Sequence, residues 1–311
     1  MNVLRRLPYV SRVYRLLWMH VLIQLPYYDQ AYRLYWHRVH PIYYRLRFGQ
    51  LDLPIIFGNS FPKSGTNLLE QILRGFKIIG PFLATGRWIN TYPTYVNRSP
   101  TGYKRPAEDL LRDIYSLLPG EIAVGHVHAT PENTSALVRP GVVNYFLYRD
   151  PRDVVVSHAH WITNKDAKPR LHRYYREVLD NLEERITMSI LGVPDDALEF
   201  TNIRARFEPY LGWLELDQVM SIRFEDLIHN RERAIGQMIN HLQAGGYRLA
   251  VKREEAVAAL MKCVDPAKSL TFREGKTGGW RKHFTDEHKA LFKEVAGDLL
   301  IRLGYEEDKD W

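Results

Sequence analysis

The sequence predicts an α/β protein of three layers, in which a central parallel sheet lies between two layers of helices. Four short apolar runs have the length and composition of buried strands: 53–58, 121–125, 142–148 and 219–224. Helical stretches lie between and after these runs, so strand and helix alternate along the chain. Such alternation favours a parallel sheet with helices on both faces, whose ligands bind beyond the carboxyl ends of the strands.

The size and composition of the chain fit one large domain with an N-terminal extension. Its 311 residues, 45% of them hydrophobic, can bury one large α/β core or two small ones. We expect a single domain over 51–311, preceded by an extension at 1–50. The one cysteine, Cys263, excludes an intramolecular disulfide framework and indicates a reducing compartment. No Cys and His residues have the spacing of a zinc site, so we expect no metal.

The apolar stretches of the sequence are too short for a membrane-spanning helix. Such a helix needs about 18 or more predominantly apolar residues. The longest candidate, 16–25, is interrupted by His20 and Gln24, so we expect a cytoplasmic protein. The formal net charge of +7 and the isoelectric point near 9.3 suit polyanionic ligands, a membrane surface or nucleic acid alike.

The segment Phe-Pro-Lys-Ser-Gly-Thr-Asn at 61–67 is a polar loop between the first predicted strand and an amphipathic helix. A lysine, hydroxyl groups and a glycine at a helix N-terminus supply N–H donors, a positive dipole end and a mobile ammonium, which suit phosphate or sulfate oxygens. A Walker A loop is excluded, because it requires glycine where this chain has Pro62 and Phe57. The structural alternative is an ordinary glycine-containing turn. The candidate anion-binding residues are Lys63, Ser64, Gly65, Thr66 and Asn67.

The residues after the predicted strand 142–148 form a second motif, Arg-Asp-Pro-Arg-Asp-Val-Val-Val-Ser, in which Asp150 is the expected N-cap of a helix. Arg149 offers a bidentate fork to a dianion, and Ser157 lies on the following helix, close enough to its N-terminal end to reach the same anion. The alternative is a surface arginine and a solvated serine. A third, glycine-rich motif lies at 272–285, where Arg273 can reach the same anion.

In order and spacing these three motifs resemble those of sulfotransferases that use 3′-phosphoadenosine 5′-phosphosulfate (PAPS). The first is similar to the family's Pro-Lys-Ser-Gly-Thr-(Thr/Asn) phosphosulfate loop, the second to its 3′-phosphate site, and the third to a glycine-rich motif near the C-terminus. The resemblance covers roughly residues 53–305. It implies a sulfotransferase fold and PAPS as the donor. Golgi members usually carry a signal-anchor helix, so the lack of one favours the cytosolic type.

The resemblance also implies roles for individual residues. It makes Lys63 the cation that assists the leaving group, and it assigns Arg149 and Ser157 to the 3′-phosphate. Phe224, in Arg-Phe-Glu-Asp-Leu, corresponds to an aromatic residue near the adenine, while the adjacent Glu225 fits a structural role at a helix N-terminus. Further donor-binding residues implied by the resemblance are Ser64, Gly65, Thr66, Asn67, Arg273, Glu274 and Gly275. Two positions depart from the commoner pattern, because Asn67 replaces a threonine and Leu68 replaces a tryptophan that stacks on adenine.

Sulfuryl transfer to a hydroxyl requires a base with a pKa near neutrality, and histidine has one. Val-Gly-His-Val-His at the end of the run 121–125 contains two candidates. Alignment on the family's Gly-His-Leu-Pro makes His126 the base. Alignment on its Lys-Thr-His-Leu-Pro makes His128 the base instead and places His126 at the family's lysine. We assign His126, because the residues downstream then also fit, and the alternative is a pair of structural histidines.

The N-terminal extension at 1–50 differs in composition from the remainder. It contains eight arginines, eight tyrosines and two tryptophans, no lysine, and Asp29 as its one acid. Interleaved arginines and aromatic residues suit the interface of an anionic membrane. They equally suit a cover over an acceptor pocket, a homodimer contact or, given the arginine-rich start, a mitochondrial targeting segment.

These observations predict a sulfotransferase that moves a sulfuryl group from PAPS to a hydroxyl or amine of a small-molecule or lipid acceptor. The sequence contains nothing that identifies the acceptor, and no specific nucleic acid is expected. One alternative is a P-loop kinase with a degenerate phosphate loop, although neither its magnesium ligands nor a Walker A glycine can be placed. The other is an anion-binding module that has kept the fold and lost turnover.

Overall fold

The computed structural model describes residues 33–91, 106–164, 169–195, 198, 200–265, 267 and 275–311. The chain forms two compact units, Met1–Gln50 and Leu51–Trp311. In the first unit the described residues form one helical run, which consists of a first turn at 33–34, the π-helical segment η3 (Tyr35–Val39) and α3 (His40–Phe48).

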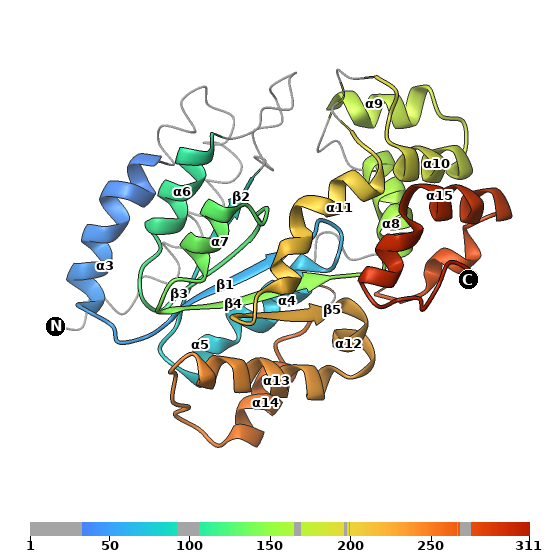
Figure 1. The fold of residues 1–311 in the computed structure, drawn as a ribbon. Coiled ribbons are helices and arrows are strands. Elements are labelled where there is room, and N and C mark those ends of the chain that lie inside the picture. The colour runs from blue at the N-terminus through green and yellow to red at the C-terminus, as the bar shows by residue number, and fades with distance from the viewer. Residues whose placement is uncertain are drawn as a thin grey trace. The chain divides into compact units, whose positions relative to one another are not determined.

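The second unit is built on a five-stranded sheet whose strands are all parallel (Figure 1). Its strands are β1 (Ile55–Ser60), β2 (Leu83–Asn90), β3 (Glu121–His126), β4 (Val142–Tyr148) and β5 (Val219–Arg223), in the order β2-β3-β1-β4-β5. Because the connections leave β1 and β4 in opposite directions, these neighbouring strands form the switch point at which ligands of such sheets bind. The predicted parallel sheet is confirmed.

Helices cover both faces of this sheet and make the three predicted layers. One face carries α4 (Thr66–Arg74), α5 (Phe76–Ile79), α12 (Phe224–His229), α13 (Arg231–Ala244) and α14 (Arg253–Met261). Of these, α5, α13 and α14 lie below the sheet in Figure 1. The other face carries α6 (Ala107–Tyr115), α7 (Pro131–Leu137), α8 (Pro151–Asn164), α9 (Pro169–Glu177), α10 (Leu182–Leu191), α11 (Ile203–Leu211), the 3-10 turns η5 (Gly212–Glu215) and η7 (Gly279–Lys282), and α15 (Asp286–Arg302).

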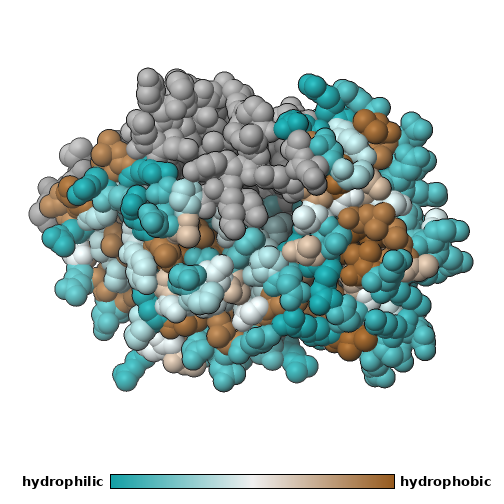
Figure 2. Space-filling view, turned by 45° about the horizontal axis from the view of Figure 1, so that its top comes forward, coloured by the Kyte–Doolittle hydropathy of each residue, from teal (hydrophilic) through white to brown (hydrophobic). Residues whose placement is uncertain are grey.

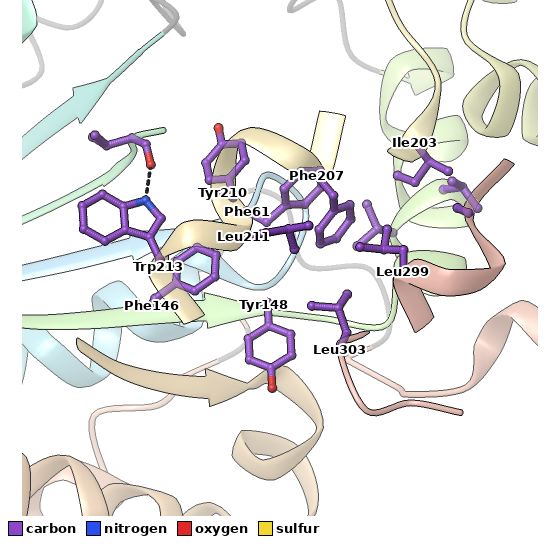
Figure 3. Close-up of a cluster of buried hydrophobic side chains, with 14 of the residues drawn as sticks. Phe61, Phe146, Tyr148, Ile203, Phe207, Tyr210, Leu211, Trp213, Leu299 and Leu303 are labelled. Atoms are coloured by element: carbon purple, nitrogen blue, oxygen red, sulfur yellow. Dashed lines mark hydrogen bonds between the residues drawn. The ribbon is translucent and has the colours of Figure 1, made fainter. Parts of the chain in front are cut away.

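Each face of the sheet has its own apolar core, because successive side chains of a strand point to opposite faces. Tyr145 and Leu147 of β4 belong to the core under α4 and α13, whereas Phe146 and Tyr148 belong to the core under α8 and α11. Figure 3 shows this second core, in which α11 and η5 direct aromatic rings toward the sheet. There Phe61, the residue that follows β1, stacks on Phe207 with ring centroids 3.6 Å apart, and this contact anchors the start of the 61–67 loop.

Two features of the fold differ from a simple reading of the sequence. The sequence did not predict the edge strand β2, because its residues do not form a continuous apolar run: they include Gly86, with a φ of 73°, and the fully buried Arg87. The pairing of β2 with β3 is irregular between Leu83 and Arg87. Acidic partners compensate the buried guanidinium: Asp113 and Glu121 lie within 3.9 Å of it. α15 has a kink at Ala296, whose φ of −147° is not helical, and Phe292, Ala296, Leu299 and Leu303 form its buried face while Leu291 and Val295 are half-buried beside it.

Hydrophilic and hydrophobic residues are interspersed over the face of the molecule in Figure 2. Among the residues that the structure describes, no helix is both long enough and apolar enough to cross a membrane.

Candidate functional site

The loop between β1 and α4 has a backbone conformation that few residues adopt. Lys63 has a φ of 70° and Gly65 a φ of 99°, and positive values are rare for residues with a side chain. A Cβ atom on Gly65 would lie 2.5 Å from the ring of Phe224. Both the conformation and the lack of space therefore require glycine at this position.

The N-terminus of α4 presents donors suited to an anion. Gly65 is its N-cap, and no side chain caps the helix there. Ser64 is fully buried, and its hydroxyl has no hydrogen-bond partner among the described residues. A buried hydroxyl without a partner is destabilising by about 1–3 kcal/mol. With the positive end of the helix dipole, these groups fit a phosphate or sulfate oxygen.

The side chain of Lys63 contacts an aromatic ring of α8. Its ammonium nitrogen Nζ lies 4.7 Å from the ring centroid of Trp161, a cation–π distance. Trp161 is half-buried and follows Ser157 by four residues, so the two lie on the same face of α8. The helix that carries the predicted 3′-phosphate serine therefore also contacts the lysine of the loop.

His126, the last residue of β3, is fixed at both its backbone and its ring. Its backbone N–H donates to the Asn90 side-chain oxygen at 2.8 Å, and its ring Nδ1 lies 2.8 Å from the Ser60 carbonyl oxygen. Because a carbonyl oxygen can only accept, Nδ1 carries the proton and Nε2 keeps a lone pair. Burial, opposed by the Ser60 hydrogen bond and assisted by the charge of Lys63, lowers the pKa of His126 to about 4. At neutral pH the ring is therefore an uncharged proton acceptor beside the lysine.

His128 lies beyond the end of β3, so the alternation of side chains along a strand does not extend to it. Its backbone N–H donates to the Thr91 hydroxyl at 3.0 Å, and its ring packs edge-on against Tyr210 of α11 with centroids 4.8 Å apart. The ring of His126 instead packs against Trp88 of β2. The two histidines therefore contact different elements, although they are two residues apart.

Arg149 follows β4, the neighbour of β1, and its guanidinium is already engaged by protein groups. Its Nη2 donates to the Lys276 carbonyl oxygen at 2.8 Å and to the Asp153 carboxylate at 3.3 Å. The guanidinium carbon lies 4.5 Å from the ring centroid of Phe224, whose ring also contacts Gly65. Its Nε is buried and has no hydrogen-bond partner in the described part of the chain. One ring thus links the arginine to the loop of the first motif.

Asp153 joins the second motif to the third. Its carboxylate accepts from the backbone N–H of Gly278 at 2.8 Å and from that of Trp280 at 2.9 Å. Gly278 has a φ of 68°, which glycine adopts without strain. These bonds hold the described part of the glycine-rich motif against the start of α8. Sequence reasoning gave Asp153 no role, because its partners lie more than a hundred residues away.

Ring contacts connect some of the predicted site residues: Phe224 contacts both Gly65 and Arg149, and Trp161 brings α8 to Lys63. Ser157 is half-buried on α8 one turn after Asp153, and Gly275 has a φ of 60° in the segment that ends at Gly278. The Thr66 hydroxyl lies 2.7 Å from the Ser60 hydroxyl, so it is already engaged. Arg273 and Glu274 lie outside the described residues.

Comparison with known proteins identifies the family of this site. The sequence matches the sulfotransferase domain over residues 55–304. The chain belongs to this family. Mouse sulfotransferase SULT7A1 complexed with PAP has a similar fold, at 13% identity and a TM-score of 0.54 over 81% of this chain and 86% of that chain. Retinol dehydratase in complex with androsterone and the inactive cofactor PAP follows at 18% identity and a TM-score of 0.51, over 79% of this chain and 80% of that chain. No curated protein matched the sequence.

Family membership confirms the resemblance to PAPS-dependent sulfotransferases and excludes the alternative of a P-loop kinase. It also places the sulfotransferase domain within the second unit of the chain. No group of three or more His, Cys, Asp or Glu side chains suited to a metal ion occurs among the described residues of this sulfotransferase.

Sequence reasoning missed the polar residues that position His126. The Asn59 side chain accepts from the backbone N–H of Val127 at 2.8 Å and donates to the Val127 carbonyl oxygen at 2.9 Å. The Trp213 indole donates to the same oxygen at 2.7 Å, as the dashed line in Figure 3 shows. Ser60 and Asn90 bind His126 directly. The available signal was the appearance of asparagine and serine at the ends of buried strands, where a polar side chain needs a partner.

Asp150, which follows Arg149, and Glu225, whose carboxylate binds the Asp150 backbone, have structural roles, as expected for Glu225. Its carboxylate accepts from the Tyr305 hydroxyl at 2.7 Å and from the backbone N–H of Asp150 at 3.3 Å. Burial raises the pKa of Glu225. Asp150 caps α8 as predicted, because its side chain accepts from the Arg152 backbone N–H at 2.9 Å. This network fixes the backbone on either side of the predicted 3′-phosphate arginine.

Proposed function

We propose that this sulfotransferase transfers a sulfuryl group from PAPS to a hydroxyl or amine of a small-molecule or lipid acceptor. The observation that carries the proposal is the pairing of a neutral, oriented His126 with Lys63 beside the uncapped N-terminus of α4. An imidazole that is already unprotonated at neutral pH and a cation at one anion-binding loop are the two groups that sulfuryl transfer uses. A bound anionic donor would offset the charge of Lys63 and so raise the pKa of His126 from about 4 toward neutrality. The presence of PAP in the structures of mouse SULT7A1 and retinol dehydratase supports the identity of the donor.

The residues around the loop fit the 5′ end of such a donor. The buried Ser64 hydroxyl, which has no partner among the described residues, can donate to an oxygen ligand, and Gly65 lacks the Cβ atom that would otherwise strike Phe224. We assign the phosphosulfate oxygens to the loop and the first turn of α4, that is to Lys63, Ser64, Gly65, Thr66 and Asn67.

The 3′-phosphate is assigned to the region of Arg149. Arg149, whose Nε has no partner among the described residues, directly precedes α8, Ser157 lies on that helix one turn after Asp153, and Phe224 presents an aromatic face for the adenine side of the site. By resemblance, the residues that complete this end are Arg273, Glu274 and Gly275.

The donor supplies a sulfuryl group attached to a phosphate that leaves as 3′-phosphoadenosine 5′-phosphate (PAP). His126 removes the proton of the acceptor hydroxyl through Nε2, because the Ser60 carbonyl holds the proton of Nδ1. Lys63 neutralises charge that develops on the leaving phosphate oxygen. Trp161 orients the Lys63 ammonium from α8 and so limits the positions that this long side chain samples.

Calorimetric titration of the purified protein tests the donor assignment. We expect PAP to bind most tightly, adenosine diphosphate to bind about one to two orders of magnitude more weakly for lack of the 3′-phosphate, and chelation of metal to change neither. Tighter binding of magnesium-ATP would overturn the proposal. Release of PAP in the presence of a phenol, a steroid, a sugar or a lipid alcohol then tests turnover. An inactive anion-binding module would bind PAP and release none with any of them.

A further inference from the structure

The helical run at 33–48 exposes a continuous apolar stripe. Val39, Ile42, Tyr43 and Leu46 follow the i, i+3, i+4, i+7 pattern of one helix face, and they are 48%, 63%, 51% and 83% exposed. The π-helical segment Tyr35–Val39 adds a residue to its turn, which brings Leu34, 60% exposed, into line with Val39.

The same helical run has a second, buried face. Trp36, His40 and Tyr44 are spaced four residues apart and are buried, and the ring centroids of Trp36 and His40 are 4.8 Å apart. A surface helix of a soluble protein usually has one apolar face and one polar face. Here a second face, about a third of a turn round the helix from the buried aromatic residues, is apolar as well, so something other than water is expected to cover it.

The charges around the stripe indicate what covers it. At 3.6 residues per turn, Arg38 and Arg45 lie on one flank of the stripe and Arg47 on the other, and all three are exposed. No aspartate or glutamate occurs from residue 33 to residue 51. Long arginine side chains beside an apolar face reach the headgroups of a bilayer while their stems remain on apolar surface.

We propose that this helix, through Leu34, Val39, Ile42, Tyr43 and Leu46, lies in the interface of an anionic phospholipid membrane. A second copy of the chain is a poorer partner, because a symmetric dimer would place these arginines against identical arginines with no acid between them. The proposal does not depend on the donor or on the site residues, all of which belong to the other unit.

Co-sedimentation of the full chain with phosphatidylcholine vesicles, with and without phosphatidylserine, tests the proposal. We expect binding to the phosphatidylserine vesicles that weakens as salt rises, and little binding to the neutral ones. Ile42→Ser with Leu46→Ser should reduce that binding about tenfold or more. Arg45→Gln with Arg47→Gln should reduce it by about fivefold for each charge.

Matched control variants change residues of similar exposure elsewhere. Ile78→Ser with Val178→Ser removes two side chains that are 56% and 58% exposed, and Arg176→Gln with Arg248→Gln removes two exposed charges. Both pairs should bind vesicles like the parent protein. Melting temperatures and PAP affinity should be unchanged in every variant, since the altered side chains are exposed.

Several results would overturn the proposal. These are no vesicle binding by the parent protein, equal binding to neutral vesicles, or binding that the Ile42 and Leu46 changes leave intact. Elution of the parent protein as a dimer that these changes convert to a monomer would assign the stripe to a second copy of the chain. A fall in melting temperature in the Ile42 and Leu46 variant would assign it to the fold.

Discussion

The loop after β1 and the arginine after β4 lie at the ends of neighbouring strands, yet their polar groups are engaged differently. In the loop, the Ser64 hydroxyl is buried without a partner among the described residues, and Gly65 leaves α4 without a side-chain cap. Arg149 instead donates to Asp153 and to the Lys276 carbonyl oxygen. At the loop the hydroxyl of Ser64 has no acceptor among the described residues, whereas at Arg149 the Nη2 donor is already engaged and the buried Nε is left without one.

This difference indicates how each half meets an anion. The loop is preorganised, so an oxygen ligand gains hydrogen bonds there without breaking any at Ser64. At Arg149 an anion must share or replace contacts that also hold the segment 275–280 through Asp153. Under the proposed assignment, binding of the 3′-phosphate at Arg149 is therefore coupled through Asp153 to the position of the segment 275–280.

The largest expected effect comes from His126, the proposed base. His126→Ala should lower kcat by about two to four decades, the usual size of general acid–base catalysis, with PAP affinity little changed. His128→Ala should retain a measurable rate, since its ring packs on Tyr210 of α11. Steady-state kinetics of the two variants decide the assignment. A larger loss in His128→Ala would make His128 the base and leave His126 at the position of the family's lysine.

The lowered pKa of His126 gives a pH prediction. Because the ring stays neutral down to a pKa of about 4, the acid limb of kcat/KM should fall near pH 4 rather than near 6.5. Between these values the unfolded chain binds a proton that the folded chain does not, so stability declines as pH falls, by roughly 3 kcal/mol in total from this group. Chemical denaturation from pH 7 to pH 4 should show a shallower decline in His126→Gln. Equal declines would show that the ring titrates normally.

Removal of Arg149 tests the other half of the site. Arg149→Ala should weaken PAP binding by about one to two orders of magnitude, since a hydrogen bond to a charged group contributes about 1.5–3 kcal/mol. Adenosine 5′-monophosphate has no 3′-phosphate and serves as the control ligand, whose affinity should barely change. Equal weakening of both ligands in calorimetry would contradict the assignment of Arg149 to the 3′-phosphate.

The contact between Lys63 and α8 predicts an effect of intermediate size. Trp161→Leu should lower kcat by about fivefold to thirtyfold, which corresponds to a cation–π contribution of about 1–2 kcal/mol. Trp161→Phe keeps an aromatic face and should lose less. A loss confined to the KM of the acceptor would place Trp161 in the acceptor pocket instead, and a fall in melting temperature alone would make it a packing residue.

The sequence predicted the parts of this fold that depend on local pattern. Buried parallel strands appear as continuous apolar runs, and for this reason 142–148 matches β4. β2 lacked such a run, since Arg87 is stable in the interior only through partners far along the chain. The kink at Ala296 has no signal in the sequence, because the residues around it continue as a helix without proline.

The residues of the candidate site likewise fall into those that their sequence neighbours signal and those that contacts between distant segments position. The loop residues at 61–67 and the cap at Asp150 are signalled by neighbouring residues, so the sequence predicted them. The bonds from Asp153 to Gly278 and Trp280, and the clamp of Asn59 on Val127, join residues that are distant in sequence. Such pairs depend on the order of the strands, which periodicity does not specify.

The smallest expected effect is that of Ser64→Ala, which should stabilise the free protein and weaken its binding of PAP. These opposite effects distinguish the two halves of the site most directly. Ser64→Ala removes a buried hydroxyl without a partner in the described residues, so the free protein should gain about 0.5–1 kcal/mol of stability. PAP binding should weaken by about fivefold to tenfold, because the bound anion loses a donor. The matched variant Thr66→Val removes a hydroxyl that lies 2.7 Å from the Ser60 hydroxyl, and it should lower stability instead. Melting curves with and without PAP measure both quantities, and a Ser64→Ala protein that is less stable without ligand would show that its hydroxyl already has a partner.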